Sequence, residues 1–125
     1  MHQIIQTPNA PAPIGPYSQA ILAQNTLYCS GQIAINPATG ELIQESIEAE
    51  THQVIKNLQA VLQAAEMDIH HVVKCSIFLS SMDLFQAVNA VYAEYFSASE
   101  PARETVAVAG LPKGVNVEIS CIAVR

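Results

Sequence analysis

The C-terminal segment constrains the fold most strongly, because its side chains alternate in character over its whole length. Every second residue from Val115 to Ala123 is apolar, whereas the residues between them, from Asn116 to Val124, are mixed. A period of two residues is typical of a β-strand with one buried face. The segment from Val72 to Leu79 repeats the pattern, so we expect two strands of one sheet. Its apolar set consists of Val73, Cys75, Ile77 and Leu79.

Two other segments have the period of an α-helix. Apolar residues recur every three or four positions from Ile47 to Ala65, and again from about Asp83 to Phe96. Ser46 is the expected N-cap of the first helix. Glu48 and Glu50 fall in its first turn, where the positive end of the helix dipole favours acidic side chains.

The remaining strands are shorter. His2 to Gln6 predicts one strand, and Ser18 to Ala23 with Leu27 to Ser30 predicts a hairpin. We expect Thr105 to Ala109 to form a second hairpin with the C-terminal strand, connected through the turn residues from Gly110 to Gly114.

The resulting element order is β-β-β-α-β-α-β-β. This order predicts an α+β fold in a single domain, residues 1–125, with two helices on one face of a mixed sheet. The opposite face is too apolar to remain in water, so we expect copies of the chain to cover it in a ring. The apolar residues expected there are Val72, Phe78, Ile122 and Val124.

Composition limits the classes of function. The net charge is −6 and the five Lys and Arg residues are spread singly, which argues against a nucleic-acid partner. Cys29, Cys75 and Cys121 each lie in an apolar stretch without a CxxC pair, so we expect buried thiols and no metal site. No cofactor motif, membrane-length apolar run or leader is present, which predicts a cytoplasmic protein without a membrane partner.

Arg103 and Glu118 are the candidate chemical residues. In the expected hairpin Thr105 lies opposite Glu118, and alternation places Arg103 on the same face, within a few ångströms of that carboxylate. One interpretation is an ion pair that joins subunits. The other is a site in which Arg103 binds a small carboxylate and Glu118 holds or activates a water molecule.

Six groups of residues occur in an order and spacing that resemble a known family. They are Ile14-Gly15-Pro16-Tyr17, Ser30-Gly31-Gln32, Asn36-Pro37 with Thr39-Gly40-Glu41, Pro101-Ala102-Arg103, Leu111-Pro112-Lys113-Gly114, and Val117-Glu118-Ile119 with Ala123-Val124. Together they resemble the reactive intermediate deaminase (RidA/YjgF) family nearly from end to end.

The resemblance implies a chorismate-mutase-like fold assembled as a homotrimer, with clefts between subunits and no cofactor. It implies hydrolysis of 2-iminobutanoate and 2-iminopropanoate, which pyridoxal-phosphate-dependent dehydratases release, to 2-keto acids and ammonia. Arg103 then corresponds to the residue that binds the substrate carboxylate, and Glu118 to the one that orients the attacking water. The residues that resemble cleft-lining positions are Tyr17, Ser30, Gly31, Asn89 and, through its backbone, Thr105.

Three positions depart from the family pattern. Thr105 stands where the family often has cysteine, Glu100 stands where an aromatic residue usually precedes Pro101, and Glu104 replaces a small residue. Residues 97–100 also form a shortened loop. These departures leave the substrate range open.

Several alternative functions remain open. A non-catalytic protein that binds a 2-keto acid or a similar small carboxylate needs the same Arg103. A chorismate mutase shares the architecture, but its dianionic substrate calls for several clustered cations. An RNA-acting or translation-inhibiting role belongs to some relatives, and a chaperone-like role for the exposed surface is a further alternative.

Overall fold

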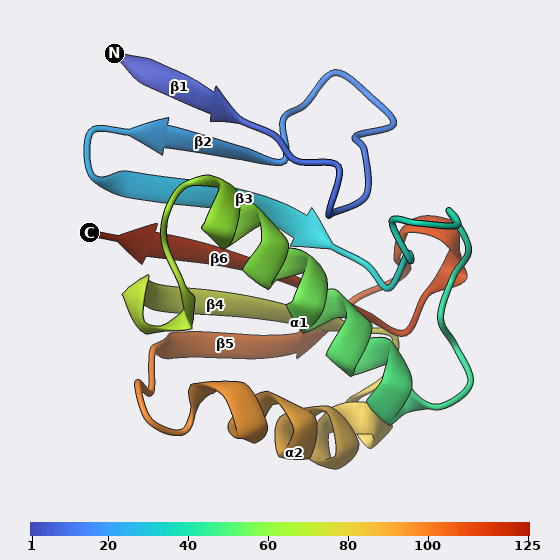
Figure 1. Cartoon of the computed structure of the whole chain (residues 1–125). Helices are drawn as coiled ribbons and strands as arrows, with labels where there is room; N and C mark the ends of the chain where they lie inside the picture. Colours follow the sequence, from blue (N-terminus) through green and yellow to red (C-terminus); the bar gives the residue numbers. More distant parts are fainter.

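The six strands of the chain form one sheet, which two helices cover on one side. The computed structural model describes residues 1–125, and the sheet order is β1-β2-β3-β6-β4-β5 (Figure 1). The strands are β1 (His2–Ile5), β2 (Ala20–Ala23), β3 (Thr26–Gln32), β4 (Val72–Leu79), β5 (Ala102–Ala107) and β6 (Val117–Val124). The helices are α1 (Ile47–Ala64) and α2 (Phe85–Phe96), with short 3-10 turns at Ile69–His71, Met82–Leu84 and Pro112–Gly114.

The predicted element order is confirmed, and most predicted ends lie within two residues of the observed ones. The Ser46 side chain accepts a hydrogen bond from the Ala49 amide at 3.0 Å, so it caps α1 as expected. β4 has the predicted ends, Val72 and Leu79. None of the helices combines the length and apolar character that crossing a bilayer requires.

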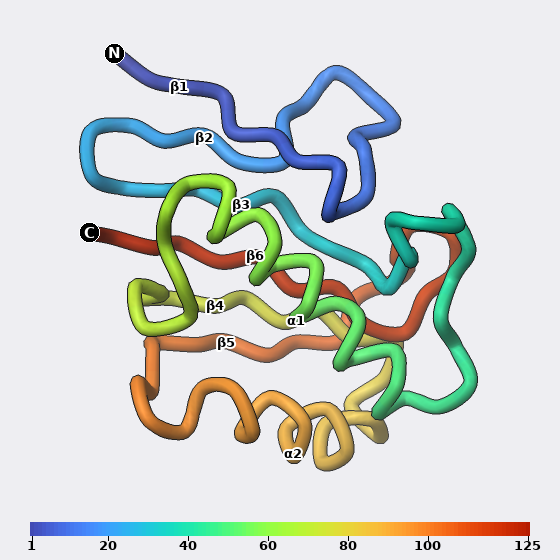
Figure 2. The backbone as a smooth tube through the Cα atoms, in the orientation of Figure 1, coloured from blue at the N-terminus to red at the C-terminus, as the bar shows by residue number.

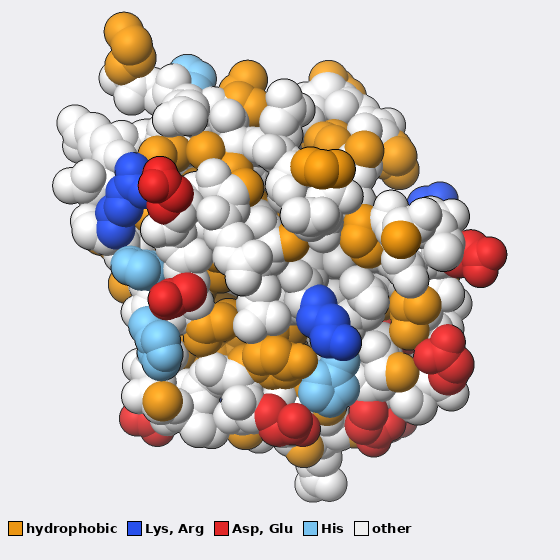
Figure 3. Space-filling model, in the orientation of Figure 1, with side chains coloured by type: hydrophobic (Ala, Val, Ile, Leu, Met, Phe, Trp, Pro, Cys, Tyr) orange, Lys and Arg blue, Asp and Glu red, His pale blue; other side chains and the backbone are white.

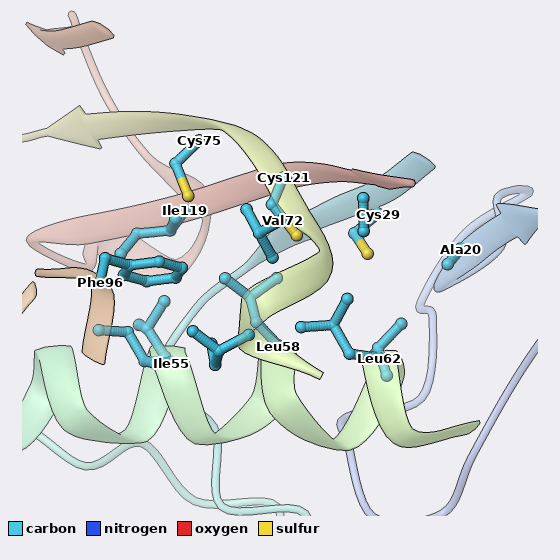
Figure 4. Close-up of a cluster of buried hydrophobic side chains, with 14 of the residues drawn as sticks. Ala20, Cys29, Ile55, Leu58, Leu62, Val72, Cys75, Phe96, Ile119 and Cys121 are labelled. Carbon is cyan, nitrogen blue, oxygen red and sulfur yellow. The ribbon is translucent and has the colours of Figure 1, made fainter. Parts of the chain in front are cut away.

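The hydrophobic core lies between α1 and the sheet. Leu58 and Leu62 of α1 face a row of three thiols on neighbouring strands (Figure 4). Cys29 pairs with Cys121, which pairs with Cys75, and all three are free and buried as predicted. This side of the sheet therefore holds the alternating apolar positions of β3, β4 and β6.

The predicted hairpin between residues 105–109 and the C-terminal strand is wrong. β5 lies at the edge of the sheet and runs parallel to β4, whereas β6 lies between β3 and β4 and is antiparallel to both. The connection from Gly110 to Gly114 therefore crosses the end of β4 instead of closing a tight turn. In this arrangement β6 is paired on both sides, and its apolar face is fully buried under α1.

The predicted alternation in β4 fails at its first two residues. The register shifts between Val72 and Lys74, so Val72 is buried with the core and Val73 is 48% exposed. This irregularity, a β-bulge, moves one side chain to the other face. Val72 therefore leaves the predicted set of open-face residues.

The sheet face opposite the helices is open in one chain. Tyr28, Val106 and Val124 on this face are each at least 41% exposed. Lys74 and Glu104 form an ion pair there at 3.1 Å, and Ser76 donates a hydrogen bond to the same carboxylate. The open face therefore combines exposed apolar side chains with a polar cluster.

Candidate functional site

Three loops project beyond the same end of the sheet (Figure 2). They are the Pro-rich loop before β2, the segment after β3 and the connection before β6. Side chains and backbone of these loops and of the adjoining strands enclose a hollow of about 350 Å³. The residues that line the hollow are Pro11, Ala12, Ile14, Tyr17, Gln19, Ser30, Gly31, Gln32, Ile33, Ile35, Pro112 and Glu118. Four predicted site residues therefore lie together here: Tyr17, Ser30, Gly31 and Glu118.

Glu118 is the acidic residue of this hollow, which we call the Glu118 hollow. Its side chain projects from β6 on the open face, opposite Phe78 of β4. It is partly buried, and this burial raises the pKa of the carboxyl above its usual value. A carboxylate that is poorly solvated in this way is a better proton acceptor than one in water.

Gly31 gives the Glu118 side chain its space. A β-carbon at position 31 would lie 2.8 Å from the Cδ atom of Glu118 and 3.0 Å from its Cγ atom. Only glycine allows the carboxylate to lie against this part of β3, where the register with β6 shifts between Cys29 and Gln32.

We therefore expect Gly31→Ala to displace the Glu118 side chain, because the new methyl group would occupy the space of its carboxylate. The measurement is a crystal structure of the variant together with its thermal unfolding. Gly110→Ala is the matched control, since no atom lies within 4 Å of its would-be β-carbon. An unmoved Glu118 side chain in Gly31→Ala would show that this position does not require glycine.

Ser30 and Gln19 shape the hollow through hydrogen bonds. The Ser30 hydroxyl donates to the Ser18 carbonyl at 2.6 Å, so its proton is already used within the chain. Gln19, which the sequence analysis missed, is 2% exposed, and its amide donates to the carbonyls of Ala10 and Pro11. These bonds hold the Pro-rich loop over the hollow, and Tyr17 from that loop stays 52% exposed.

Arg103 lies in a second hollow, which we call the Arg103 hollow. Its Nη1 atom donates to the Oδ1 atom of Asn89 at 2.6 Å, and its guanidinium carbon lies 4.8 Å from the centre of the Tyr92 ring. The lining residues are Asn89, Tyr92, Ala93, Phe96, Ser97, Glu100, Pro101 and Arg103. The side chain forms no ion pair with any carboxylate of its own chain. Its remaining N–H donors can therefore bind a carboxylate from outside the chain.

The prediction that Arg103 and Glu118 lie within a few ångströms of each other is wrong for a single chain. Arg103 pairs with Cys75 in the β4–β5 register, so its side chain lies on the helix-covered face and contacts α2. Glu118 pairs with Phe78, on the opposite face. The two hollows share no lining residue. The cause is the strand order, because β4 separates β5 from β6.

Thr105 and Glu104 occupy different surroundings. The Thr105 hydroxyl is buried without a hydrogen-bond partner, and the residue lines neither hollow. Glu104 points away from Arg103, as predicted, and its contacts with Ser76 and Lys74 lower the pKa of its carboxyl. The Glu104 side chain is therefore not part of the Arg103 hollow.

Comparison with known proteins places the chain in a family. Residues 7–125 match the family described as Endoribonuclease L-PSP. The 2-iminobutanoate/2-iminopropanoate deaminase of Capra hircus is 46% identical over 100% of this chain and 91% of its own length. A protein named as a regulator, AldR of Lactococcus lactis, is 47% identical over 97% of this chain and 96% of its own.

Solved structures agree with these sequence matches. The crystal structure of a Thermotoga maritima protein described as an endoribonuclease has a TM-score of 0.98 and 50% identity, covering 100% of this chain and 98% of that one. The chain therefore belongs to the Endoribonuclease L-PSP family, which is the Rid (RidA/YjgF) family that its motifs indicated.

Proposed function

We propose that the protein hydrolyses small 2-imino acids to 2-keto acids and ammonia, in a site completed by two copies of the chain. The Arg103 hollow of one copy supplies the carboxylate-binding group, and the Glu118 hollow of the next supplies the group that activates water. The sequence resemblance to deaminases that are named for 2-iminobutanoate and 2-iminopropanoate supports this reaction.

The observation that carries the proposal is that Arg103 and Glu118 lie in separate hollows and project from opposite faces of one sheet. Each hollow holds half of the required chemistry, and the open face beside Glu118 exposes apolar side chains such as Tyr28 and Val106. A closed ring places one surface of each copy against a different surface of its neighbour. Such packing brings Arg103 and Glu118 together and covers the apolar face. We propose a homotrimer as the ring.

Arg103 binds and orients the substrate. Asn89 and the rings of Tyr92 and Phe85 hold the guanidinium, with Phe85 at 5.7 Å. A planar guanidinium can bind a carboxylate through two parallel hydrogen bonds, which fixes the plane of a 2-imino acid. The C=N carbon next to that carboxylate is then held at a defined distance from the opposing hollow.

Glu118 assists the attack of water on this carbon. Its carboxylate accepts a proton from the water as the new C–O bond forms, and the imine nitrogen receives a proton as the C=N bond becomes single. The resulting carbinolamine loses ammonia and leaves the 2-keto acid. Proton transfer by a positioned carboxylate contributes typically about 10²–10⁴-fold, which suits a substrate that already reacts with water.

Glu118→Gln is expected to lower kcat about 100-fold while changing ligand binding little. Since the pKa of Glu118 is raised, wild-type activity is expected to fall as the pH is lowered through that raised value. An unchanged kcat in the variant would contradict the assigned role.

The raised pKa of Glu118 also affects stability. It stabilises the folded chain at low pH, where the carboxyl is protonated, and this contribution is lost as the pH rises. Glu118→Gln should therefore unfold at a higher temperature than wild type at neutral pH.

The direct test couples the protein to an enzyme that releases 2-iminobutanoate. A threonine dehydratase reaction is run with semicarbazide, which traps the free imine as a semicarbazone. If the protein hydrolyses the imine, less semicarbazone forms as its concentration increases. Unchanged trapping at high protein concentration would reject the proposed activity.

A non-catalytic role in binding a small carboxylate is the second candidate. The relative named as a regulator, AldR of Lactococcus lactis, favours it. Both functions require Arg103, so they differ in turnover and not in affinity. Binding of 2-oxobutanoate without any loss of semicarbazone would support the second candidate over the first.

A further inference from the structure

Glu100 is the acidic residue at the rim of the Arg103 hollow. It follows the C-terminal end of α2, and its amide donates to the Phe96 carbonyl at 2.8 Å. Its backbone is left-handed, with φ of 47°, and Pro101 follows directly. Helices commonly end in this way, although glycine is the usual residue at the left-handed position. The helix end therefore places a carboxyl-bearing side chain at the rim where the fold itself requires none.

The Arg103 hollow is lined by two charged residues, the acid Glu100 and the cation Arg103. The other lining residues are aromatic, small or neutral polar. No oxygen of Glu100 lies within ion-pair distance of the guanidinium. Arg103 is therefore free to bind one carboxylate of a ligand, and Glu100 lines the same hollow.

The Glu118 hollow adds another acid and no cation. Its lining consists of apolar residues and neutral polar residues apart from Glu118. A site made from both hollows thus has one guanidinium and two acidic side chains. A ligand with a single carboxylate matches this arrangement, whereas a second carboxylate has no cation to pair with.

We infer that Glu100 restricts the site to 2-imino and 2-keto acids with one carboxylate, by repelling a second carboxylate on the substrate side chain. This inference rests on the proposed function, because it takes Arg103 as the group that binds the first carboxylate. Glu100 acts on selectivity and has no part in the reaction steps.

The expected size of the effect follows from the exposure of Glu100. When two like charges lie about 6–8 Å apart at a protein surface, replacing one of them by a neutral group strengthens binding of the ligand that carries the other by roughly 3- to 30-fold. Because the rim is exposed to solvent, salt should weaken this repulsion.

The test measures binding of three probes by calorimetry at low and high ionic strength. The probes are 2-oxobutanoate, the dicarboxylate 2-oxoglutarate, and the 5-methyl ester of 2-oxoglutarate. The ester is nearly as large as the dicarboxylate but lacks its second charge. The variants are Glu100→Gln and Glu100→Gly, and the latter suits the left-handed backbone.

Glu66→Gln is the matched control. Glu66 is also an exposed acidic residue with a left-handed backbone, φ 59°, at the end of a helix, and it lines neither hollow. The control therefore removes the same charge from the same kind of backbone position.

We expect wild type to bind 2-oxobutanoate and the ester more tightly than 2-oxoglutarate. Both Glu100 variants should tighten 2-oxoglutarate binding about 3- to 30-fold at low salt, with less change at high salt, and leave the ester unaffected. An equal change for the ester, or an equal change in the control, would overturn the inference. If 2-oxobutanoate binds normally but selectivity does not change, the inference fails while the proposed function stands. If no acid binds, both fail.

Discussion

Arg103→Ala is expected to lower kcat/KM by about 10²–10⁴-fold, since each charge-assisted hydrogen bond to the substrate carboxylate contributes about 1.5–3 kcal/mol. Nothing else in the Arg103 hollow carries a positive charge. Thermal unfolding should change little, because the side chain is exposed and forms a single hydrogen bond within the chain, to Asn89. The measurement is imine hydrolysis in the semicarbazide assay.

Two variants serve as controls for this prediction. Arg103→Lys keeps the charge but loses the two parallel hydrogen bonds, so an intermediate loss is expected. Arg125→Ala removes the other arginine, which donates to the Ala65 carbonyl at 2.7 Å and lines neither hollow. Full activity of Arg103→Ala would refute the role of Arg103 in substrate binding.

Glu50→Ala is expected to have the largest effect on stability, a loss of about 3–5 kcal/mol in the free energy of unfolding. Glu50 is 1% exposed, and its carboxylate accepts hydrogen bonds from the Asn116 amide at 2.8 Å and the Asn116 side chain at 3.0 Å. It also accepts one from the Val117 amide at 3.3 Å. Removing it leaves buried donors without partners at the start of β6, next to Glu118.

Urea unfolding at fixed protein concentration measures this loss. Glu48→Ala is the control, because Glu48 lies in the same helical turn and is exposed. Its removal should cost less than about 1 kcal/mol, the usual contribution of an acid at a helix N-terminus. Similar values for the two variants would show that the hydrogen bonds of Glu50 contribute little.

Periodicity predicted the elements well and their neighbours less well. The apolar stripe of α1 and the alternation of β4 depend on which side chains are buried. The order of apolar and polar residues within each segment shows this directly. The position of β5 depends on whether it pairs with β4 or with β6. Alternation predicts that Arg103 and Thr105 lie on the same face of their strand, but it does not predict which strand lies beside them.

The same limit explains why the candidate site was predicted only in part. Motifs identified Arg103 and Glu118, and the structure places both in hollows. Their relative position was wrong, because it followed from the incorrect hairpin. Gln19 and Glu50 were missed as buried polar residues, since their partners are mostly backbone groups that are distant in sequence and leave no local pattern.

In the proposed site, one copy of the chain supplies Arg103 and its neighbour supplies Glu118. The most direct measurement mixes two inactive variants, Arg103→Ala and Glu118→Gln, in equal amounts, exchanges their subunits by unfolding and refolding, and assays imine hydrolysis. In a closed ring of shared sites, random exchange gives about one quarter of the sites an intact Arg103 and an intact Glu118. We predict that activity returns to about that fraction of the refolded wild type. A mixture that stays as inactive as its separate components, although mass spectrometry shows mixed assemblies, would contradict the claim.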